Sequence, residues 1–584
     1  MAEDRAQRRL AAILAIDVVG YSRLMHHDEA GTLAALKSLH RTVLDPLVTE
    51  HQGRIFKLMG DGVLVEFASA VNAVECAVSM QRDLALANDG LPPDRRVEIR
   101  IGINLGDVLV EGNDLYGDGV NIAARLQELA EPGGICVSSK LRDEIGNKLS
   151  LIFDDLGQQR LKNIAAPVRV CRLRTGVHEP TSIATRLPLP DKPSIAILPF
   201  DNLSGDPGQQ YFSDGISEDI ITDLSKISGL FVIARNSAFT FRGKSVRIQE
   251  ISRELGVRYV LEGSVRRAGN RVRITTQLID GTTGGHLWAE RYDRDLTDFF
   301  AVQDEVTREI VAALAIKLTP DERQRLIGRG TDNLEAYDHL VRGTHLAFQV
   351  TNETNIEAGK LLERAIELDS QLARAFTMLS HVQLLAYVNG WQEHPEALPQ
   401  RALELALQAI ALDNDDPEGH WNLGLIYLWR RQHDLAIAAE QRALHLNPNF
   451  ASAHAGLGNI LHYTGRSPEA VEPLLTAMRL DPYYSEIWLH FLALAYFGTG
   501  RYEDAAATLR RRIIRRPDTD ISRVLLAACY GYLGRGEEAR ALWQEALRLN
   551  PQYSLEQKRR ILPYKNSSDF DHLLDGLHKA GLPE

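Results

Sequence analysis

The C-terminal half of the chain repeats itself with a period of 34 residues. Ala-rich helical stretches end at Leu412-Asp413, at Leu446-Asn447 and at Leu480-Asp481, each 34 positions after the last. A unit of this length holds two short helices and a turn, and it is too small to bury its own apolar face. Successive units must therefore stack on one another, so residues 331–584 are predicted to form an α-solenoid.

Two further patterns mark the first helix and the turn of each unit. Residues 423–427 (LGLIY) and 457–458 (LG) place a Leu-Gly pair at equivalent positions. Glycines that suit the bends between helices follow at similar intervals: Gly465, Gly500 and Gly534. The period and these residues resemble tetratricopeptide (TPR) repeats. The resemblance implies a concave groove that binds a peptide or a partner protein, whose identity the sequence leaves open.

Two α/β regions precede the repeats. Residues 8–173 alternate strand-like and helix-like runs in the order β-α-β-β-α-β, which predicts a ferredoxin-like fold. Within it we expect a strand pair around 97–110 and a helix over 118–129. Residues 174–192 hold three prolines and no periodicity, as a linker does. Residues 193–320 form a second α/β domain, so the chain is a multidomain protein of α/β and all-α parts.

Charge, cysteine content and hydropathy exclude several classes of protein. The net charge is −12 and no segment carries a basic patch, which argues against a nucleic-acid polymer as partner. The four cysteines lie far apart without a CxxC pair, so neither a disulfide framework nor a thiolate zinc site is expected. No stretch of about 18 apolar residues occurs and the first ten residues lack an apolar signal core. We therefore expect no membrane span and a cytoplasmic location.

The first α/β region contains three short motifs whose residue types suit phosphoryl transfer. Residues 16–22 (IDVVGYS) place an aspartate at a strand end, residues 57–61 (KLMGD) place a lysine four positions before a second aspartate, and residues 114–125 (DLYGDGVNIAAR) form the third motif. Strand-end carboxylates can hold divalent cations, and two such ions stabilise an in-line displacement at phosphorus. A nearby arginine can stabilise the developing charge. A lysine donor with an aspartate acceptor matches the edge of adenine, whereas guanine presents the opposite pattern.

These motifs, over residues 8–173, resemble the catalytic domain of class III adenylate cyclases. The resemblance implies conversion of ATP to 3′,5′-cyclic AMP and pyrophosphate at the interface of a head-to-tail homodimer. It implies two divalent metal ions, Mg²⁺ or Mn²⁺. By resemblance, the metal ligands are Asp17 and Asp61, the adenine-selecting residues are Lys57 and Asp114, the ribose-orienting residue is Asn121 and the transition-state arginine is Arg125. A looser correspondence would place Lys162 at the triphosphate.

The middle region resembles the TolB-like amino-terminal domain, through residues 197–200 (ILPF) and 212–219 (FSDGISED). The acidic residues Asp214, Glu218 and Asp219 are expected to open a helix and to interact with its N-terminal dipole. The middle region and the repeats are expected to regulate the cyclase output. Two alternatives stay open: a guanylate cyclase, or a catalytically silent cyclase fold that serves as a scaffold while the repeats bind partners.

Overall fold

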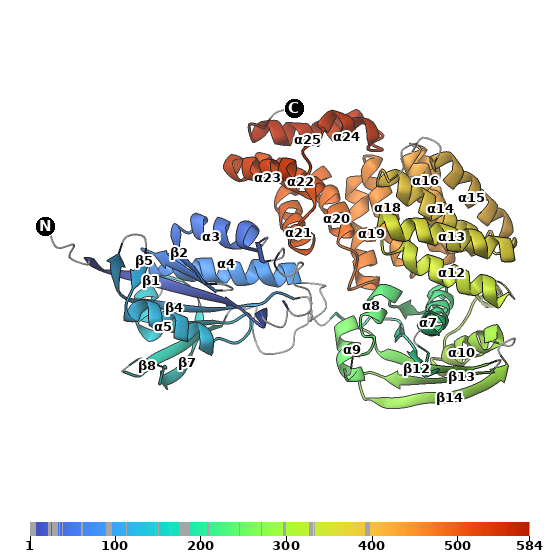
Figure 1. Cartoon of the computed structure of the whole chain (residues 1–584), viewed down its shortest axis with the longest axis horizontal. Coiled ribbons are helices and arrows are strands. Elements are labelled where there is room, and N and C mark those ends of the chain that lie inside the picture. Colours follow the sequence, from blue (N-terminus) through green and yellow to red (C-terminus); the bar gives the residue numbers. More distant parts are fainter. Residues whose placement is uncertain are drawn as a thin grey trace. The chain divides into compact units, whose positions relative to one another are not determined.

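The computed structural model describes residues 7–21, 25, 33, 36–37, 39–59, 62–88, 96–111, 114–146, 148–149, 151–162, 164, 166–174, 187–206, 209–244, 246–269, 271–295, 299–325, 331, 333–391 and 398–582 (Figure 1). The chain divides into two compact units. The first comprises residues 1–183 and 509–522, and the second comprises residues 184–508 and 523–584.

The first unit is built on a mixed eight-stranded sheet. Its strands are β1 (Gln7–Val18), β2 (Gly53–Met59), β3 (Gly62–Phe67), β4 (Ile99–Glu111), β5 (Asp114–Tyr116), β6 (Ile135–Ser138), β7 (Ile152–Gln159) and β8 (Val168–Arg174). The order is β2-β3-β1-β4-β6-β8-β7, and β5 pairs with β4. The four strands β2, β3, β1 and β4 pair antiparallel, as in a ferredoxin-like sheet, so that prediction is confirmed.

Helices cover the two faces of this sheet unequally. On one face, η1 (His40–Leu44), α3 (Asp45–Glu50), α4 (Ala70–Asn88) and α6 (Ser139–Ile145) enclose the larger core, in which Phe67 and Met80 are fully buried. On the other face, α5 (Asp118–Leu129) packs on β1 and β4 over a smaller core around Ile13 and Ala123. The predicted helix over 118–129 is thus confirmed to the residue.

Two glycines of β4 let α5 lie directly against the strand. A Cβ at Gly102 would collide with the backbone nitrogen of Gln127 and the carbonyl oxygen of Ala123. A Cβ at Gly106 would lie 3.0 Å from the Cα of Gly119. The absence of side chains at these two positions therefore sets the distance between the sheet and the helix that carries the third motif.

The expected strand pair around 97–110 is wrong, because this region forms the single long strand β4. It pairs with β1 from Ile99 to Val110, so the apolar run continues without a turn. Before β2, the chain is described continuously from Leu39 onward. Strand β5 and helix α6 were not expected, because three and seven residues are too few to show a period.

The second unit begins with a six-stranded sheet in the order β11-β9-β12-β13-β14, with β10 paired to β12. Its strands are β9 (Ser194–Ile197), β10 (Asp201–Asn202), β11 (Phe231–Val232), β12 (Tyr259–Ala268), β13 (Arg271–Asp280) and β14 (Gly285–Asp295). Its helices are α7 (Gln210–Ser225), α8 (Arg235–Phe239), α9 (Ile248–Leu255) and α10 (Phe299–Ala313). Helices α7 and α10 share one core with the sheet, which confirms a second α/β domain.

Helices alone form the remainder of this unit (Figure 1). They are α11 (Pro320–Arg325), α12 (Leu334–Ala347), α13 (Asn352–Leu368), α14 (Ala373–Val388), α15 (Leu398–Leu412), α16 (Pro417–Trp429), α17 (His433–Leu446), α18 (Ala451–Tyr463), α19 (Ser467–Leu480), α20 (Ile487–Gly498), α21 (Tyr502–Arg515), α22 (Asp520–Tyr532), α23 (Gly536–Leu549), α24 (Leu555–Ile561) and α25 (Ser567–Lys579). The end of α21 and the start of α22 fall within residues 509–522, which belong to the first unit. The predicted turn glycines Gly465, Gly500 and Gly534 all have φ between 73° and 80°, a region open to glycine. Among the described residues, no helix is both long and apolar enough to cross a bilayer.

Candidate active site

Asp17 lies near the end of β1, on the side of the sheet that α5 covers. Its partner in the antiparallel ladder with β3 is Gly62, and its partner in the ladder with β4 is Arg100. Arg100 Nη2 lies 2.5 Å from Asp17 Oδ2, and the two side chains are 31% and 24% exposed. Arg100 was not foreseen, because a cation 83 positions away has no sequence signal that links it to Asp17.

The second predicted metal ligand, Asp61, lies outside the described residues, and only its neighbour Gly62 can be placed. The donor chemistry at Asp17 fits a divalent cation, since its carboxylate is a hard oxygen ligand that is partly open to solvent. Within the described ranges, no group of three or more Asp, Glu, His or Cys side chains is arranged to hold a metal ion.

The structure brings Lys57 of β2 and Asp114 of β5 to the same place, with Tyr116 between them. The Tyr116 hydroxyl donates a hydrogen bond of 3.1 Å to Asp114 Oδ2. Lys57 Nζ lies over the ring of Tyr116, 5.4 Å from its centroid. The hydrogen bond and the negative charge of Asp114 raise the pKa of Tyr116. The two residues predicted to select adenine are therefore neighbours, although 57 positions separate them in the sequence.

Asn121 and Arg125 lie one turn apart on α5, as their spacing predicts. The start of this helix is held by Asn104 of β4, whose buried side-chain amide donates a hydrogen bond of 3.0 Å to the Gly119 carbonyl. Asn121 is exposed, and Arg125 forms an ion pair with Glu128 on its own helix. Lys162 is exposed in the turn between β7 and β8, and no observation tests its role.

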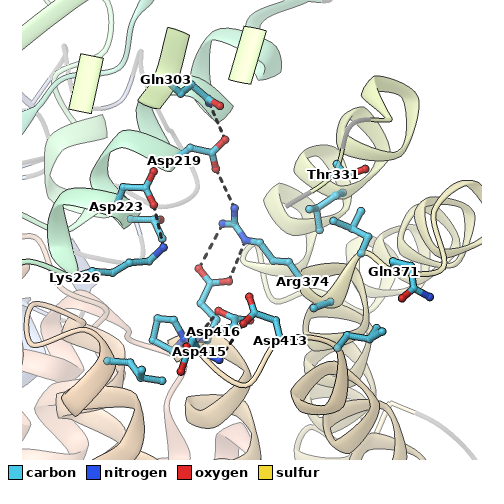
Figure 2. Close-up of a pocket in the computed structure, with 18 of the residues that line it drawn as sticks. Asp219, Asp223, Lys226, Gln303, Thr331, Gln371, Arg374, Asp413, Asp415 and Asp416 are labelled. Atoms are coloured by element: carbon cyan, nitrogen blue, oxygen red, sulfur yellow. Dashed lines mark hydrogen bonds and ion pairs between the residues drawn. The ribbon is translucent and has the colours of Figure 1, made fainter. Parts of the chain in front are cut away.

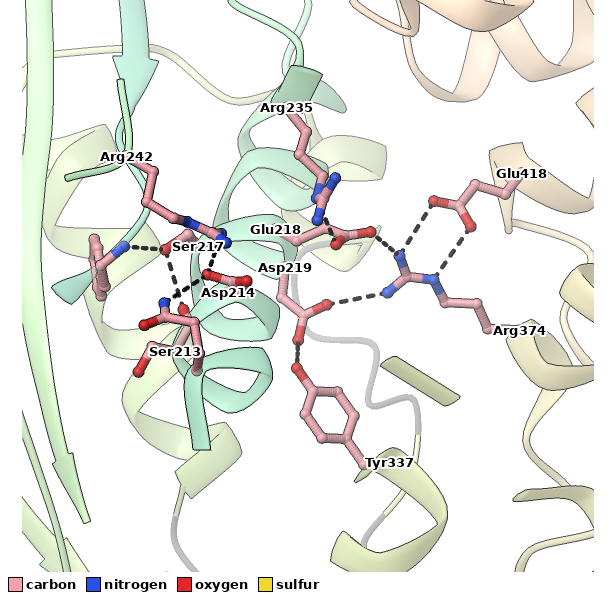
Figure 3. Close-up of polar contacts among 12 residues, drawn as sticks. Ser213, Asp214, Ser217, Glu218, Asp219, Arg235, Arg242, Tyr337, Arg374 and Glu418 are labelled. Carbon is pink, nitrogen blue, oxygen red and sulfur yellow. Dashed lines mark hydrogen bonds and ion pairs between the residues drawn. The ribbon is translucent and has the colours of Figure 1, made fainter. Parts of the chain in front are cut away.

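The acidic residues of the middle domain are ion-pair partners rather than a helix-opening cluster (Figure 3). Asp214 lies 2.5 Å from Arg242, and Glu218 lies 2.8 Å from Arg235. Asp219 lies in the third turn of α7, where the helix dipole has little effect. The expectation that the dipole explains these residues is therefore wrong for most of the cluster.

One arginine of the repeats joins this acidic cluster to the solenoid. Arg374 of α14 lies 3.1 Å from both Glu218 and Asp219 of the middle domain and 3.2 Å from Glu418 of α16 (Figure 3). The Tyr337 hydroxyl of α12 donates a further hydrogen bond of 2.5 Å to Asp219. The middle domain and the first repeats therefore share one polar network.

The boundary loops of later repeats extend the same interface. Asn449, which follows α17, donates through its side-chain amide to the carbonyls of Ser225 at 2.9 Å and Leu230 at 3.0 Å. Asp481, one period after Asn447, accepts a hydrogen bond from Ser237 of α8. The loops that recur every 34 residues thus also bind the middle domain.

A cavity of about 660 Å³ lies between the middle domain and these repeats (Figure 2). Eight of its lining residues are acidic and three are Lys or Arg, and Figure 2 shows several of them paired across it. Lys226 Nζ lies 2.9 Å from Asp223 Oδ1. Burial, together with the charge of Glu418, raises the pKa of Asp416 to about 7. None of the six predicted active-site residues lines this cavity.

Three family models match the chain. Residues 5–169 match the adenylate and guanylate cyclase catalytic domain. Residues 191–309 match the second domain of HilA/YgeH-like transcriptional regulators. Residues 398–449, 430–485 and 492–554 match the tetratricopeptide repeat, so that prediction is confirmed. The match of the middle region differs from the TolB-like resemblance, which stays a prediction.

Individual proteins named as adenylate cyclases agree with the first of these matches. "Putative adenylate cyclase 3" of Rhizobium meliloti (strain 1021) is 54% identical over 441 residues, which cover 75% of this chain and 75% of that protein. An adenylate cyclase of Streptomyces coelicolor is 33% identical over 143 residues, or 24% of this chain and 36% of that protein. A solved adenylate/guanylate cyclase/hydrolase from Silicibacter pomeroyi is 43% identical, with 29% of this chain and 98% of that chain covered and a TM-score of 0.28.

Proposed function

Because the chain belongs to the adenylate and guanylate cyclase family, we propose that it converts ATP to 3′,5′-cyclic AMP and pyrophosphate. In this reaction the 3′-hydroxyl oxygen of ATP bonds to the α-phosphorus, and the bond from that phosphorus to the β-phosphate oxygen breaks. The hydroxyl proton passes to solvent and pyrophosphate leaves. The observation that carries the choice of ATP is the proximity of Lys57 and Asp114 around Tyr116.

The described side chains have chemistry suited to each part of the substrate. The Lys57 ammonium would donate to adenine N1, and the Asp114 carboxylate would accept from the 6-amino group. Asn121 would hydrogen-bond the ribose, and Arg125 would stabilise charge on the α-phosphate. Two divalent ions at Asp17 and Asp61, Mg²⁺ or Mn²⁺, would supply Lewis-acid stabilisation of the attacking and leaving oxygens.

In this proposal, Arg125 must leave its ion pair with Glu128 and bind the α-phosphate of ATP. Its ion pair with Glu128 lies on the surface of α5, where such a pair contributes about 1 kcal/mol or less. The α-phosphate can therefore compete for the guanidinium at small cost.

A homodimer is part of the proposal, and exposed apolar surface around the base-selecting residues supports it. Leu58, next to Lys57, is 64% exposed, and Tyr116 is 42% exposed. Exposed apolar surface beside a polar site is typical of a face that another chain covers. In the proposed head-to-tail dimer, one chain supplies Asp17 and Asp61 to each site and its partner supplies the other four residues.

Mixing two inactive variants tests this arrangement. Asp17→Asn and Arg125→Ala should each be inactive alone. In a mixed dimer, one site takes an intact Asp17 from one chain and an intact Arg125 from the other, so activity should return on mixing. If all six residues acted within one chain, no mixture would recover activity, and the shared-site proposal would be wrong.

A direct assay separates the proposed function from its alternatives. The purified full chain is incubated with ATP or GTP and with Mg²⁺ or Mn²⁺, and the cyclic nucleotide is identified by mass spectrometry. Cyclic AMP as the dominant product is the expected result. Equal or faster turnover of GTP would identify a guanylate cyclase, and no product from either nucleotide would favour a silent scaffold.

We also propose that the middle domain, TolB-like in our interpretation, and the repeats regulate this activity, and that the repeat groove binds a peptide or protein. The shared interface around Asn449 and Asp481 supports this, because a ligand bound to the repeats would act on both parts of the second unit. Unchanged activity and oligomeric state after removal of residues 174–584 would contradict it. A cytoplasmic location remains a prediction that cell fractionation can test.

A further inference from the structure

We propose that Tyr116 is a positioning residue for purine selection, which holds Lys57 and Asp114 in the arrangement that fits adenine. This inference rests on the proposed function and adds to it a residue that does not itself hydrogen-bond the base. Among the described residues, Tyr116 contacts both predicted selecting residues, Asp114 through its hydroxyl and Lys57 through its ring.

Strand β5 places the tyrosine beside the aspartate. Asp114 and Tyr116 are two positions apart on the strand, so their side chains project from the same face. Between them, Leu115 points the other way and is only 2% exposed, which anchors β5 in the smaller core. Tyr116 pairs with Leu109 of β4, so the position of its backbone is set by the sheet.

The hydrogen bond from Tyr116 engages one oxygen of the Asp114 carboxylate, so the two oxygens have different roles. The hydroxyl occupies Oδ2 at 3.1 Å and leaves Oδ1 available for the 6-amino group of adenine. An ionised carboxylate only accepts hydrogen bonds, whereas guanine presents an acceptor at its 6-position. A donor fixed on Oδ2 therefore favours the form and the orientation of Asp114 that accept adenine and reject guanine.

The ring of the same tyrosine restrains the lysine. A lysine ammonium sits on a flexible four-carbon stem and has no preferred direction of its own. A cation within about 6 Å of an aromatic centroid is attracted to the ring face, and Lys57 Nζ meets this condition at 5.4 Å. The ring thus limits the lysine to positions beside Asp114 while its protons remain available to adenine N1.

A purely structural role explains Tyr116 less well than the proposed positioning role does. Its side chain is 42% exposed, so it fills little of the core, and Leu115 already anchors the strand. The pKa of Tyr116 is raised by its hydrogen bond to Asp114, so the hydroxyl keeps its proton and stays a donor over the neutral range.

The test compares nucleotide preference in the full-length protein. Tyr116→Phe keeps the ring over Lys57 and removes the hydroxyl, so the ratio of kcat/KM for ATP to that for GTP should fall about fivefold. Tyr116→Leu removes both contacts and should lower the ratio further, by about tenfold or more. Tyr553→Phe, in the repeats, is the matched control and should leave the ratio unchanged. Thermal unfolding confirms that each variant is folded.

A substrate analogue isolates the hydrogen bond even if the leucine variant fails to fold. The triphosphate of purine riboside lacks the 6-amino group, so Asp114 has nothing to accept from it. Tyr116→Phe should therefore slow ATP turnover but leave turnover of this analogue unchanged. An equal loss with ATP, GTP and the analogue would show a structural role and overturn the inference.

The outcomes separate the inference from the proposed function. If the wild-type chain forms no cyclic nucleotide, or prefers GTP, the proposed function is wrong and the inference fails with it. If the wild type prefers ATP and Tyr116→Phe keeps that preference, the inference alone is overturned.

Discussion

The guanidinium of Arg100 lies 2.5 Å from the carboxylate of Asp17, across the ladder between β4 and β1. Both side chains are partly exposed, so the pair contributes about 1 kcal/mol or less to stability. The pair is important because it lies at a predicted metal ligand. Arg100 is a cation beside a predicted metal ligand, and it balances the charge of that carboxylate.

Asp17→Asn should abolish cyclase activity and leave the protein folded. The amide keeps the size of the side chain but loses the negative charge that a divalent cation requires. We expect a loss of at least 100-fold in kcat, with the melting temperature changed by only a few degrees. Cyclic AMP formation and thermal unfolding measure the two effects.

A matched control for this variant lies in the same domain. Asp155→Asn removes an exposed carboxylate of β7 that pairs with Arg169, and it should leave activity unchanged. A fully active Asp17→Asn variant would contradict the metal-ligand assignment.

Gly102→Ala should displace α5 and with it Asn121 and Arg125. The added Cβ meets the backbone of the helix rather than a side chain that can move, so either the helix shifts or the strand does. We expect a loss of about 3 kcal/mol in the free energy of unfolding and a fall in kcat larger than any rise in KM. Urea unfolding and steady-state kinetics provide the measurements.

Gly359→Ala, in α13, is the control for a glycine-to-alanine change. A Cβ there meets only Val382 Cγ1 at 3.7 Å, an ordinary contact, so this variant should be stabilised by about 0.5–1 kcal/mol. An equal response of both variants would show that Gly102 does not set the packing of α5.

Local sequence patterns predicted many of the helices, strands and turns of this chain. They did not predict the contacts between elements that are distant in the sequence. The bounds of α5 and the turn glycines of the repeats follow from periodicity and from backbone freedom, which are local properties. The pairing of Arg100 with Asp17 depends on the register of two strands, and the placement of Tyr116 depends on a three-residue strand. Arg374 lies 155 positions from Asp219, and only the fold brings them together.

Arg374→Met should loosen the interface between the middle domain and the repeats. The variant leaves Glu218, Asp219 and Glu418 facing one another without their shared cation. The arginine side chain is 22% exposed, so we expect the lower end of the usual cost of breaking a buried pair, about 3 kcal/mol. Hydrogen exchange measured by mass spectrometry should rise in α7 and α14 together.

Arg364→Met removes an exposed arginine of α13 that pairs with Glu367, and it should change neither stability nor exchange measurably. Faster exchange confined to α14 in Arg374→Met would show that the two domains do not respond as one unit. Cyclase activity measured on the same sample would show in addition whether the interface affects catalysis.

Glu440 occupies a core position of the repeats, and the equivalent residues of the neighbouring repeats are uncharged. The residues 34 positions before and after it are Ala406 and Leu474. The side chain of Glu440 is fully buried, and neither of its carboxylate oxygens has a hydrogen-bond partner in the described part of the chain. A Cβ at Gly456 would lie 2.5 Å from Oε1, so the carboxyl group fits only because glycine stands there.

Glu440→Gln should stabilise the protein in a manner that depends on pH. Burial raises the pKa of Glu440 well above its usual value, so the folded state binds its proton more tightly than the unfolded state does. The stability that this group contributes is full below the unfolded pKa of about 4.3 and is lost as the pH rises above it.

Glutamine does not ionise, so the variant and the wild type should be similar near pH 4.5. At pH 8 the variant should be more stable by about 1–3 kcal/mol. Urea unfolding across this range measures the difference, with the exposed Glu367→Gln as control, and a constant difference at all pH values would contradict the prediction.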